Sequence, residues 1–220
     1  MPACKGSEGL RVESLIELRC DEFSAQLAAK AEVPGGGGAA ALAGSLAIAL
    51  GQMAGNYTVG KKTYAAVEPE VKQLLAEGES LRCRLLELVD EDACGFAPLS
   101  HAYAIPRDDP SRAETIEAAT KQAAQAPLQM VRTLSSVVDM LERMERVGSK
   151  MLQSDVACGA ALAAAAIDMA AVNVLVNAKS LDDGEYALAL QGECDATRAD
   201  AGARARAIAN RITDSLRVKG

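Results

Sequence analysis

The segment from about Ala39 to Thr58 is the strongest constraint on the fold, because it is apolar on nearly every side. It consists mostly of alanine, glycine and leucine, with small residues recurring at Gly44, Gly51 and Gly55. A helix that is apolar all round is buried. Small residues on such a helix let neighbouring backbones approach closely. The segment therefore predicts a central helix enclosed by others.

The composition extends this expectation to the whole chain. Half of the residues are apolar, yet only 3% are aromatic and tryptophan is absent, which favours closely packed helices over a β core. No segment shows the alternation that is typical of a strand. Helices are expected at about residues 14–31, 39–58, 69–103, 111–147, 154–177 and from 182 onward. Because the connections are short, the sequence predicts an all-α, up-and-down bundle of about six helices.

Proline and glycine help to define the boundaries. Pro98 is expected to kink the third helix or end it early, and Pro127 to bend the fourth, because proline lacks a backbone donor and clashes with the preceding turn. Residues 1–12 mix proline, glycine and charges without a period, and predict a disordered leader. Residues 13–220 predict a single domain.

Charge and cysteine content argue against several classes of function. The net charge is −7 and the basic residues are dispersed, so no nucleic-acid surface is expected. The apolar run from Ala39 to Ala54 is short for a bilayer and lies far from the N-terminus, so no membrane partner is expected. Six cysteines without close paired spacing, and the single histidine His101, predict no metal site. Free thiols, and with them a cytoplasmic location, are the expectation.

Four glycines, Gly35, Gly36, Gly37 and Gly38, precede the central helix. Their unshielded N–H groups and the positive end of the helix dipole suit an anionic or polar ligand group. The loop is no P-loop, because Ala39 and Ala40 stand where lysine and serine or threonine are needed, and no strand precedes it. A tight turn between closely packed helices is the other interpretation.

The turn Gly60-Lys61-Lys62-Thr63-Tyr64 follows the central helix. If the helices alternate up and down, this turn shares one end of the bundle with Ser154 and Asp155. The glycine loop then shares the other end with Asn173 and Asn177. Asp155 lies eighteen residues before Asn173 on one helix, so the two are separated by about 27 Å.

Several of these polar residues also have ordinary structural explanations. Asn173 and Asn177 share one helix face and need hydrogen-bond partners, which a ligand, a neighbouring helix or another subunit could supply. The acidic run that ends at Asp92 is typical of a solvated face. Asp155 fits the first turn of a helix, where an acid complements the dipole. His101 near a helix end has no assigned role.

Six segments in order and spacing resemble the cyclodeaminase/cyclohydrolase family. This family includes the C-terminal domain of formiminotransferase-cyclodeaminase and the stand-alone bacterial methenyltetrahydrofolate cyclohydrolases, and the match covers roughly residues 23–183. The segments are Pro34-Gly35-Gly36-Gly37-Gly38-Ala39-Ala40, Gly60-Lys61-Lys62-Thr63-Tyr64, Asp92-Ala93-Cys94-Gly95-Phe96, Ala126-Pro127-Leu128, Ser154-Asp155 and Asn173-Val174-Leu175-Val176-Asn177-Ala178-Lys179. The last one is more similar to the cyclohydrolases. Ser149 and Met151 depart from the family, which often has asparagine there. The resemblance implies a helical homodimer.

The resemblance also implies a substrate, 5,10-methenyltetrahydrofolate, whose bridge carbon takes up water before the ring opens at N5. A carboxylate is needed to remove the water proton, with Asp155 the first choice and Asp92 the second. Lys61 is a candidate for proton transfer, and Lys61 or Lys62 for the glutamate carboxylates of the folate. The remaining substrate-binding candidates are Gly35, Gly36, Gly37, Gly38, Tyr64, Ser154, Asn173 and Asn177. No metal or redox cofactor is expected.

Two alternatives remain open at this point. One is formimidoyltetrahydrofolate cyclodeaminase, in which N10 attacks the formimino carbon and ammonia leaves. The other is a non-catalytic helical bundle that binds folate or a partner helix without turnover, an alternative kept open by the unusual Ser149 and Met151.

Overall fold

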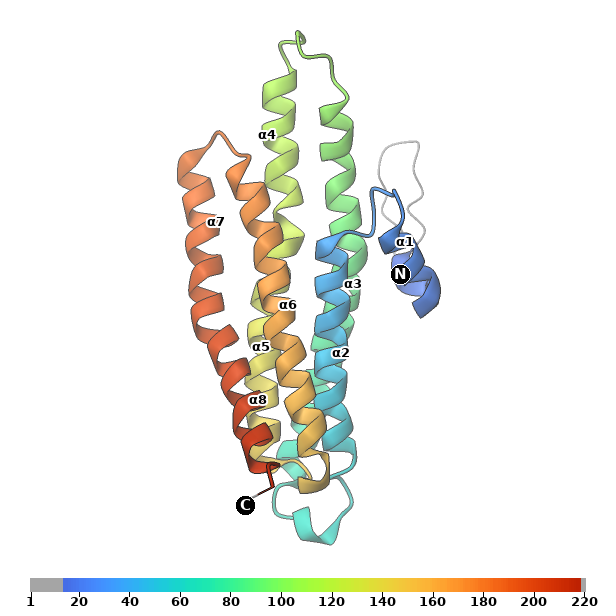
Figure 1. Cartoon of the computed structure of the whole chain (residues 1–220), viewed down its shortest axis with the longest axis vertical. Helices are drawn as coiled ribbons and strands as arrows, with labels where there is room; N and C mark the ends of the chain where they lie inside the picture. Colours follow the sequence, from blue (N-terminus) through green and yellow to red (C-terminus); the bar gives the residue numbers. More distant parts are fainter. Residues whose placement is uncertain (1–13, 219–220) are drawn as a thin grey trace.

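The computed structural model describes residues 14–218, and these form an upright bundle of helices (Figure 1). The described residues contain no strand, so the all-α prediction is confirmed. The leader predicted at residues 1–12 lies outside the described residues. The helices are α1 (Cys20–Ala28), α2 (Gly36–Asn56), α3 (Glu68–Tyr103), α4 (Arg112–Ala123), α5 (Gln125–Val147), α6 (Gln153–Lys179), α7 (Gly184–Thr197) and α8 (Ala203–Ser215).

Because α4 runs into α5 and α7 runs into α8, the eight helices form six helical segments, as predicted. Only Ala124 separates α4 from α5, and a π-helical segment, Arg198–Gly202, joins α7 to α8. Short 3₁₀ turns cover Leu15–Glu17, Lys62–Tyr64 and Lys150–Leu152. The paired ends of α3 and α4 project beyond the other helices in Figure 1.

The first helix is shorter than the predicted range of 14–31. The backbone is extended at Leu18 and Arg19, and α1 begins only at Cys20. The Glu22 carboxylate accepts a hydrogen bond from the Arg19 N–H at 2.9 Å, which fixes this start as a capping box. The sequence prediction treated two short elements as one.

The two internal prolines behave differently. α3 continues through Pro98 to Tyr103, so the proline does not end this helix early. Pro127 lies in the first turn of α5, where a missing N–H leaves no intrahelical bond unmade. The break lies at Ala124, just after Ala123, whose carbonyl would face the proline ring across one turn. The predicted bend is therefore found three residues earlier.

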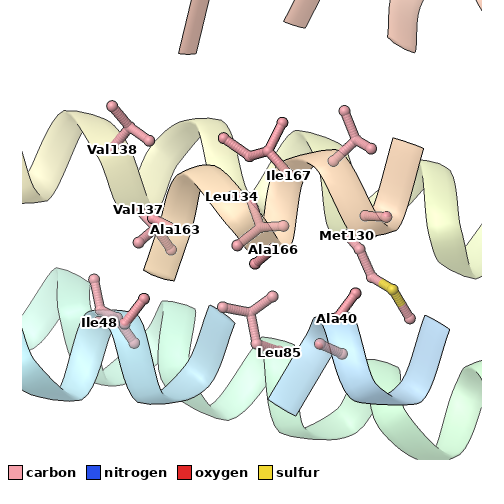
Figure 2. Close-up of a cluster of buried hydrophobic side chains, with 14 of the residues drawn as sticks. Ala40, Ile48, Leu85, Met130, Leu134, Val137, Val138, Ala163, Ala166 and Ile167 are labelled. Carbon is pink, nitrogen blue, oxygen red and sulfur yellow. The ribbon is translucent and has the colours of Figure 1, made fainter. Parts of the chain in front are cut away.

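The core confirms the role expected for the small residues of α2. A Cβ added to Gly44 would lie 2.6 Å from the Leu134 side chain, and one added to Gly51 would lie 2.7 Å from that of Leu141. On α6, a Cβ added to Gly159 would meet the Ala47 carbonyl of α2 at 2.7 Å. Larger side chains there would force the helices apart. Figure 2 shows this core, with side chains of α2, α3, α5 and α6 meeting between the ribbons.

Within residues 14–218, two helices are long and apolar enough to cross a membrane by length and composition alone. They are α2, with 21 residues, and the stretch Lys150–Lys179 that includes α6. The apolar run from Ala39 to Ala54 was expected to be too short for a bilayer. That expectation is wrong, because α2 begins before Ala39 and ends after Ala54. About half of each apolar window is buried inside the bundle, as in core helices of soluble proteins, which pass the same test. The absence of a membrane partner stays a prediction.

The cysteines agree only partly with the expectation. Cys20, Cys83, Cys158 and Cys194 are free thiols, whereas Cys94 is disulfide-bonded. The expectation of free thiols is therefore wrong for Cys94, because the spacing of cysteines along a sequence does not by itself fix which of them are oxidised. Cys4 lies outside the described residues.

Candidate active site

The structure places the candidate residues at opposite ends of α2 and α6, as the alternation of helix directions predicts. At one end, the start of α2 and the last turns of α6 surround a cavity of 180 Å³. We call this the glycine-loop site, defined by Gly35, Gly36, Gly37, Asp92, Asn173 and Asn177. At the other end lies the lysine turn, defined by Lys61, Lys62 and Tyr64, with Ser154 and Asp155 on the adjoining first turn of α6.

Asp92 is the only carboxylate from the predicted site that lines this cavity. Burial raises its pKa from 3.8 to about 6, and the Gly38 N–H, which stabilises the charged form, offsets only part of that effect. A carboxylate with a pKa of about 6 is largely ionised at neutral pH and still basic enough to take a proton. Asp92 is therefore suited to acid–base chemistry.

The glycine loop contacts the Asp92 carboxylate directly. A Cβ added to Gly37 would lie 2.5 Å from Asp92 Oδ2, so only glycine leaves room for the carboxylate. The carboxylate of Asp92 stands at the positive end of α2, where an anionic ligand group was expected. Gly38 is buried and contributes its N–H to Asp92 instead of lining the cavity. The other interpretation of the loop, that its glycines allow close packing, therefore applies to Gly37, which packs against the Asp92 carboxylate.

Asn173 and Asn177 extend the site along α6. Their side-chain amides donate to carbonyls one turn earlier, Asn173 Nδ2 to Met169 O and Asn177 Nδ2 to Asn173 O, each at 2.9 Å. Both residues line the cavity with Asp92, and an amide whose NH₂ group donates still has its oxygen as an acceptor. A Cβ on Gly36 would approach Asn173 Nδ2 to 3.2 Å, so the loop and α6 lie close together. Such a set of acceptors suits a cation or a donor-rich ring.

Part of the cavity wall was missed from the sequence. Apolar side chains of Phe96, Pro127 and Val176 line it, and Glu32 adds a second carboxylate. Phe96, Pro127 and Val176 lie in segments that carry the family resemblance, but none of them was predicted to bind substrate. Glu32 carries no signal in the sequence that distinguishes it from an ordinary surface position.

The lysine turn is tied to the segment before α6. The Tyr64 hydroxyl accepts a hydrogen bond from the Lys150 N–H at 3.0 Å, which, with nearby positive charge, lowers the pKa of Tyr64. Lys61 Nζ lies 5.9 Å from the centre of the Tyr57 ring, within range of a cation–π contact. Lys62 is exposed. Gly60 adopts φ +79°, a left-handed conformation that favours glycine.

Asp155 has a less specialised environment than Asp92. It is half-buried in the first turn of α6, and its Oδ2 accepts a 3.4 Å hydrogen bond from Ser154 Oγ. α6 is continuous from Gln153 to Lys179, so eighteen residues separate Asp155 from Asn173, or about 27 Å. One chain therefore does not bring Asp155 and Asp92 to the same small group.

Among residues 14–218, no group of three or more histidine, cysteine, aspartate or glutamate side chains could hold a metal ion. A reaction without metal stays a prediction. Ser149 is buried and its N–H donates to Thr58 Oγ1 at 2.7 Å, while Met151 is exposed.

Fold and site together define a helical-bundle protein with a half-buried carboxylate of raised pKa at a glycine loop. Residues 19–196 match the family described as formiminotransferase-cyclodeaminase, and the chain belongs to this family.

Individual relatives agree with this assignment. The chain is 37% identical to methenyltetrahydrofolate cyclohydrolase of Methylorubrum extorquens over 83% of its own length and 90% of that protein. It is 28% identical to formimidoyltransferase-cyclodeaminase of Mus musculus over 79% of its length, but spans only 33% of that longer protein. The crystal structure of formiminotetrahydrofolate cyclodeaminase from Thermotoga maritima superimposes with a TM-score of 0.78, 29% identity, and coverage of 89% of this chain and 98% of that one.

Proposed function

We propose that this protein is a methenyltetrahydrofolate cyclohydrolase, which converts 5,10-methenyltetrahydrofolate and water to 10-formyltetrahydrofolate and a proton, reversibly. One observation carries the proposal: the 37% identity to a cyclohydrolase of nearly the same extent, against 28% to the cyclodeaminase of mouse. The folate substrate and the hydrolytic activity follow from this relationship.

The glycine-loop site supports the proposal through its acceptors. The bridge carbon of the substrate lies between two ring nitrogens that share a positive charge. The carboxylate of Asp92 and the amide oxygens of Asn173 and Asn177 offer negative charge to that cation in a partly buried cavity. The site geometry thus favours Asp92 over Asp155 as the base.

The reaction then proceeds in three proton transfers, two through Asp92 and one to solvent. Water attacks the bridge carbon while Asp92 takes one of its protons, which gives a neutral tetrahedral adduct. The bond from this carbon to N5 breaks, its electron pair stays on N5, and Asp92 returns the proton there. The remaining hydroxyl proton leaves to solvent as the formyl carbonyl forms on N10.

The direct test is hydrolysis of 5,10-methenyltetrahydrofolate by the purified full-length protein. The ultraviolet absorbance of the conjugated bridge is expected to decay much faster than in the buffer blank, and a chelator is expected to leave the rate unchanged. A rate equal to the blank would contradict the enzyme proposal and favour a non-catalytic bundle. Faster release of ammonia from the formimino substrate would favour a cyclodeaminase.

We further propose that the protein forms a homodimer through α2 and α6. Exposed apolar side chains recur at helical spacing on α2, at Leu46 and Met53, on its C-cap residue Tyr57, and on α6, at Val172 and Val176. Such paired stripes are typical of a surface that packs against further helices. The lysine turn gives this face positive charge at one end, and the acids of the glycine-loop site give it negative charge at the other.

An antiparallel arrangement of two copies satisfies both features. A two-fold axis across the middle of α2 brings the lysine turn of one subunit to the glycine-loop site of its partner, so opposite charges meet. The glycine-loop site and the lysine turn lie at opposite ends of one chain. In the dimer, the glycine-loop site of one subunit and the lysine turn of its partner would lie beside the same substrate. A soluble, cytoplasmic dimer is the assembly we propose.

The substitution Leu46→Glu tests this interface. Leu46 is 53% exposed near the middle of α2, and a charge there would lie on the dimer axis. The variant is expected to elute and sediment as a monomer with unchanged helical content. Leu188→Glu on α7, where the side chain is 70% exposed, is the control and is expected to stay dimeric. If both variants keep the mass of the wild type, the face is not the interface.

A further inference from the structure

Glu32 adds a second carboxylate to the glycine-loop cavity, and no step of the proposed reaction uses it. It lies in the segment between α1 and α2, three residues before Gly35. Among the described residues that line this cavity, Glu32 and Asp92 are acidic and none is basic. A cavity lined by charge of one sign concentrates ligand groups of the opposite sign.

A hydrogen bond holds the Glu32 carboxylate in place. Its Oε1 atom accepts from the Ser100 hydroxyl on α3 at 2.9 Å. The segment that carries Glu32 is also tied to α1, because Gln26 Nε2 donates to the Val33 carbonyl at 3.0 Å. An exposed glutamate is otherwise free to rotate, and ordering it costs conformational entropy. The position of this carboxylate is therefore set by α1 and α3.

The negative charge of Glu32 is not neutralised by any described part of the chain. Within residues 14–218, neither Glu32 nor Asp92 forms an ion pair with a lysine or arginine, and Lys30, two residues before Glu32, also forms none. The hydroxyl of Ser100 is neutral, and Glu32 Oε2 accepts no hydrogen bond from the same residues. The cavity thus has two negative charges and lacks a positive one, which a ligand could supply.

The two carboxylates are spread along one wall of the cavity. Ser100, which holds Glu32, follows Asp92 on α3 by eight residues, or about 12 Å along the helix axis. Phe96 lies between them and adds an apolar surface that limits screening by water. The volume of 180 Å³ is below the range of about 300–1,000 Å³ that is usual for pockets holding a whole drug-sized ligand. The cavity suits one ring system of a folate, which both charges would then face.

We propose that Glu32 is a specificity-determining residue, whose carboxylate selects folates with a cationic one-carbon bridge over folates with an uncharged ring. The inference rests on the proposed function, which places the bridge of the substrate in the glycine-loop site. In 5,10-methenyltetrahydrofolate a positive charge is shared by N5 and N10, whereas tetrahydrofolate has the same pterin and the same glutamate without that charge. Coulombic attraction to Glu32 favours only the first of these two ligands.

The substitution Glu32→Gln tests this role in the full-length protein, because the amide keeps the shape and an acceptor for Ser100 but removes the charge. KM for 5,10-methenyltetrahydrofolate is expected to rise about three- to ten-fold at low ionic strength, the effect of one partly solvated charge. The inhibition constant of tetrahydrofolate, measured as a competitive inhibitor, is expected to stay unchanged. Added salt is expected to reduce the difference in KM between variant and wild type.

The turnover number separates this role from a catalytic one. The bridge loses its positive charge as water adds, so Glu32 attracts the bound substrate more strongly than the transition state. In Glu32→Gln, kcat is therefore expected not to fall while KM rises. Glu32→Asp keeps the charge and is expected to retain a preference for the cationic folate.

Asp109→Asn is the matched control. Asp109 also accepts a hydrogen bond from a serine hydroxyl, that of Ser111 at 2.7 Å, and is exposed in the turn between α3 and α4, but it does not line the cavity. Its substitution removes the same charge and is expected to change neither constant. The inference is overturned if Glu32→Gln binds both folates as the wild type does. It is also overturned if both are weakened equally, since Glu32 would then only fix the loop.

The two proposals fail separately. A wild type that hydrolyses the substrate, with a Glu32→Gln variant of unchanged KM, keeps the proposed function and contradicts the role of Glu32. If the wild type hydrolyses nothing, equilibrium dialysis gives Kd values for the same two folates. A preference for the cation that Glu32→Gln lowers would then keep the role of Glu32 and contradict the function.

Discussion

The substitution Asp92→Asn is expected to lower kcat/KM about 10²- to 10⁴-fold, the usual cost of losing a general base. The amide keeps the shape of the carboxylate over Gly37 but cannot take a proton. In the wild type, kcat/KM is expected to rise with pH through about 6, where Asp92 loses its proton. Initial rates of absorbance decay between pH 5 and pH 8 measure both effects.

Stability is expected to change in the opposite direction. Because the pKa of Asp92 is raised in the folded protein, the native state binds more protons than the unfolded state between about pH 4 and pH 6, so stability falls as pH rises through this window. The shift of about two units corresponds to a cost of about 3 kcal/mol above pH 6. Asp92→Asn removes that charge, and urea unfolding at pH 7.5 is expected to show a more stable variant.

Asp155→Asn is the matched control for this assignment. Asp155 is half-buried at the opposite end of α6, and its loss is expected to change turnover much less than the loss of Asp92. If Asp155→Asn is inactive while Asp92→Asn turns over normally, the base lies at the lysine turn. The original preference for Asp155 would then be correct.

Mixed dimers give the second large effect. Asp92→Asn removes the proposed base, and Lys61→Met removes the proton-transfer candidate that the resemblance implies. If Lys61 has that role, each variant is expected to be nearly inactive alone, because each removes a group from every site. If a site combines the glycine loop of one subunit with the lysine turn of its partner, a mixed dimer has one doubly substituted site and one intact site. Co-refolding equal amounts is therefore expected to restore about a quarter of the wild-type activity, since half of the dimers are mixed.

The alternative arrangement predicts a different result. If all site residues act within one subunit, each site in a mixed dimer has one substitution and the activity stays at the level of the separate variants. Differently tagged variants allow the mixed dimer to be purified and its activity measured directly. Co-refolding either variant with Leu46→Glu instead is expected to restore little, because that chain does not pair.

Much of the architecture could be predicted because local pattern and packing agree. The small residues of α2 required close neighbours, and the order of helices placed Tyr64 beside the segment before α6, as the Lys150 hydrogen bond confirms. The same alternation of helix directions predicted that the glycine loop lies at one end of the bundle with Asn173 and Asn177, and these residues line one cavity. Element ends were less predictable, because the short α1 is set by the Arg19 and Glu22 cap and not by its apolar pattern.

The half-buried position and raised pKa of Asp92 could not be predicted from its neighbours in the sequence. It follows Asp90 and Glu91, and such a run is typical of a solvated surface. In the structure, Asp90 instead accepts hydrogen bonds from Ser14 and Leu15, Glu91 pairs with Arg84, and only Asp92 faces the glycine loop. Burial of one acid among three depends on packing between α2 and α3, which no local pattern specifies.

Thr58 has a consequence for how the protein moves. This residue is fully buried, donates to the Ala54 carbonyl at 2.7 Å and accepts from the Ser149 N–H at 2.7 Å. Breaking that link would leave a buried donor unsatisfied, so the two connecting segments open together or not at all. We therefore expect the glycine-loop end, whose connection to α1 is exposed over much of its length, to open more readily than the lysine end.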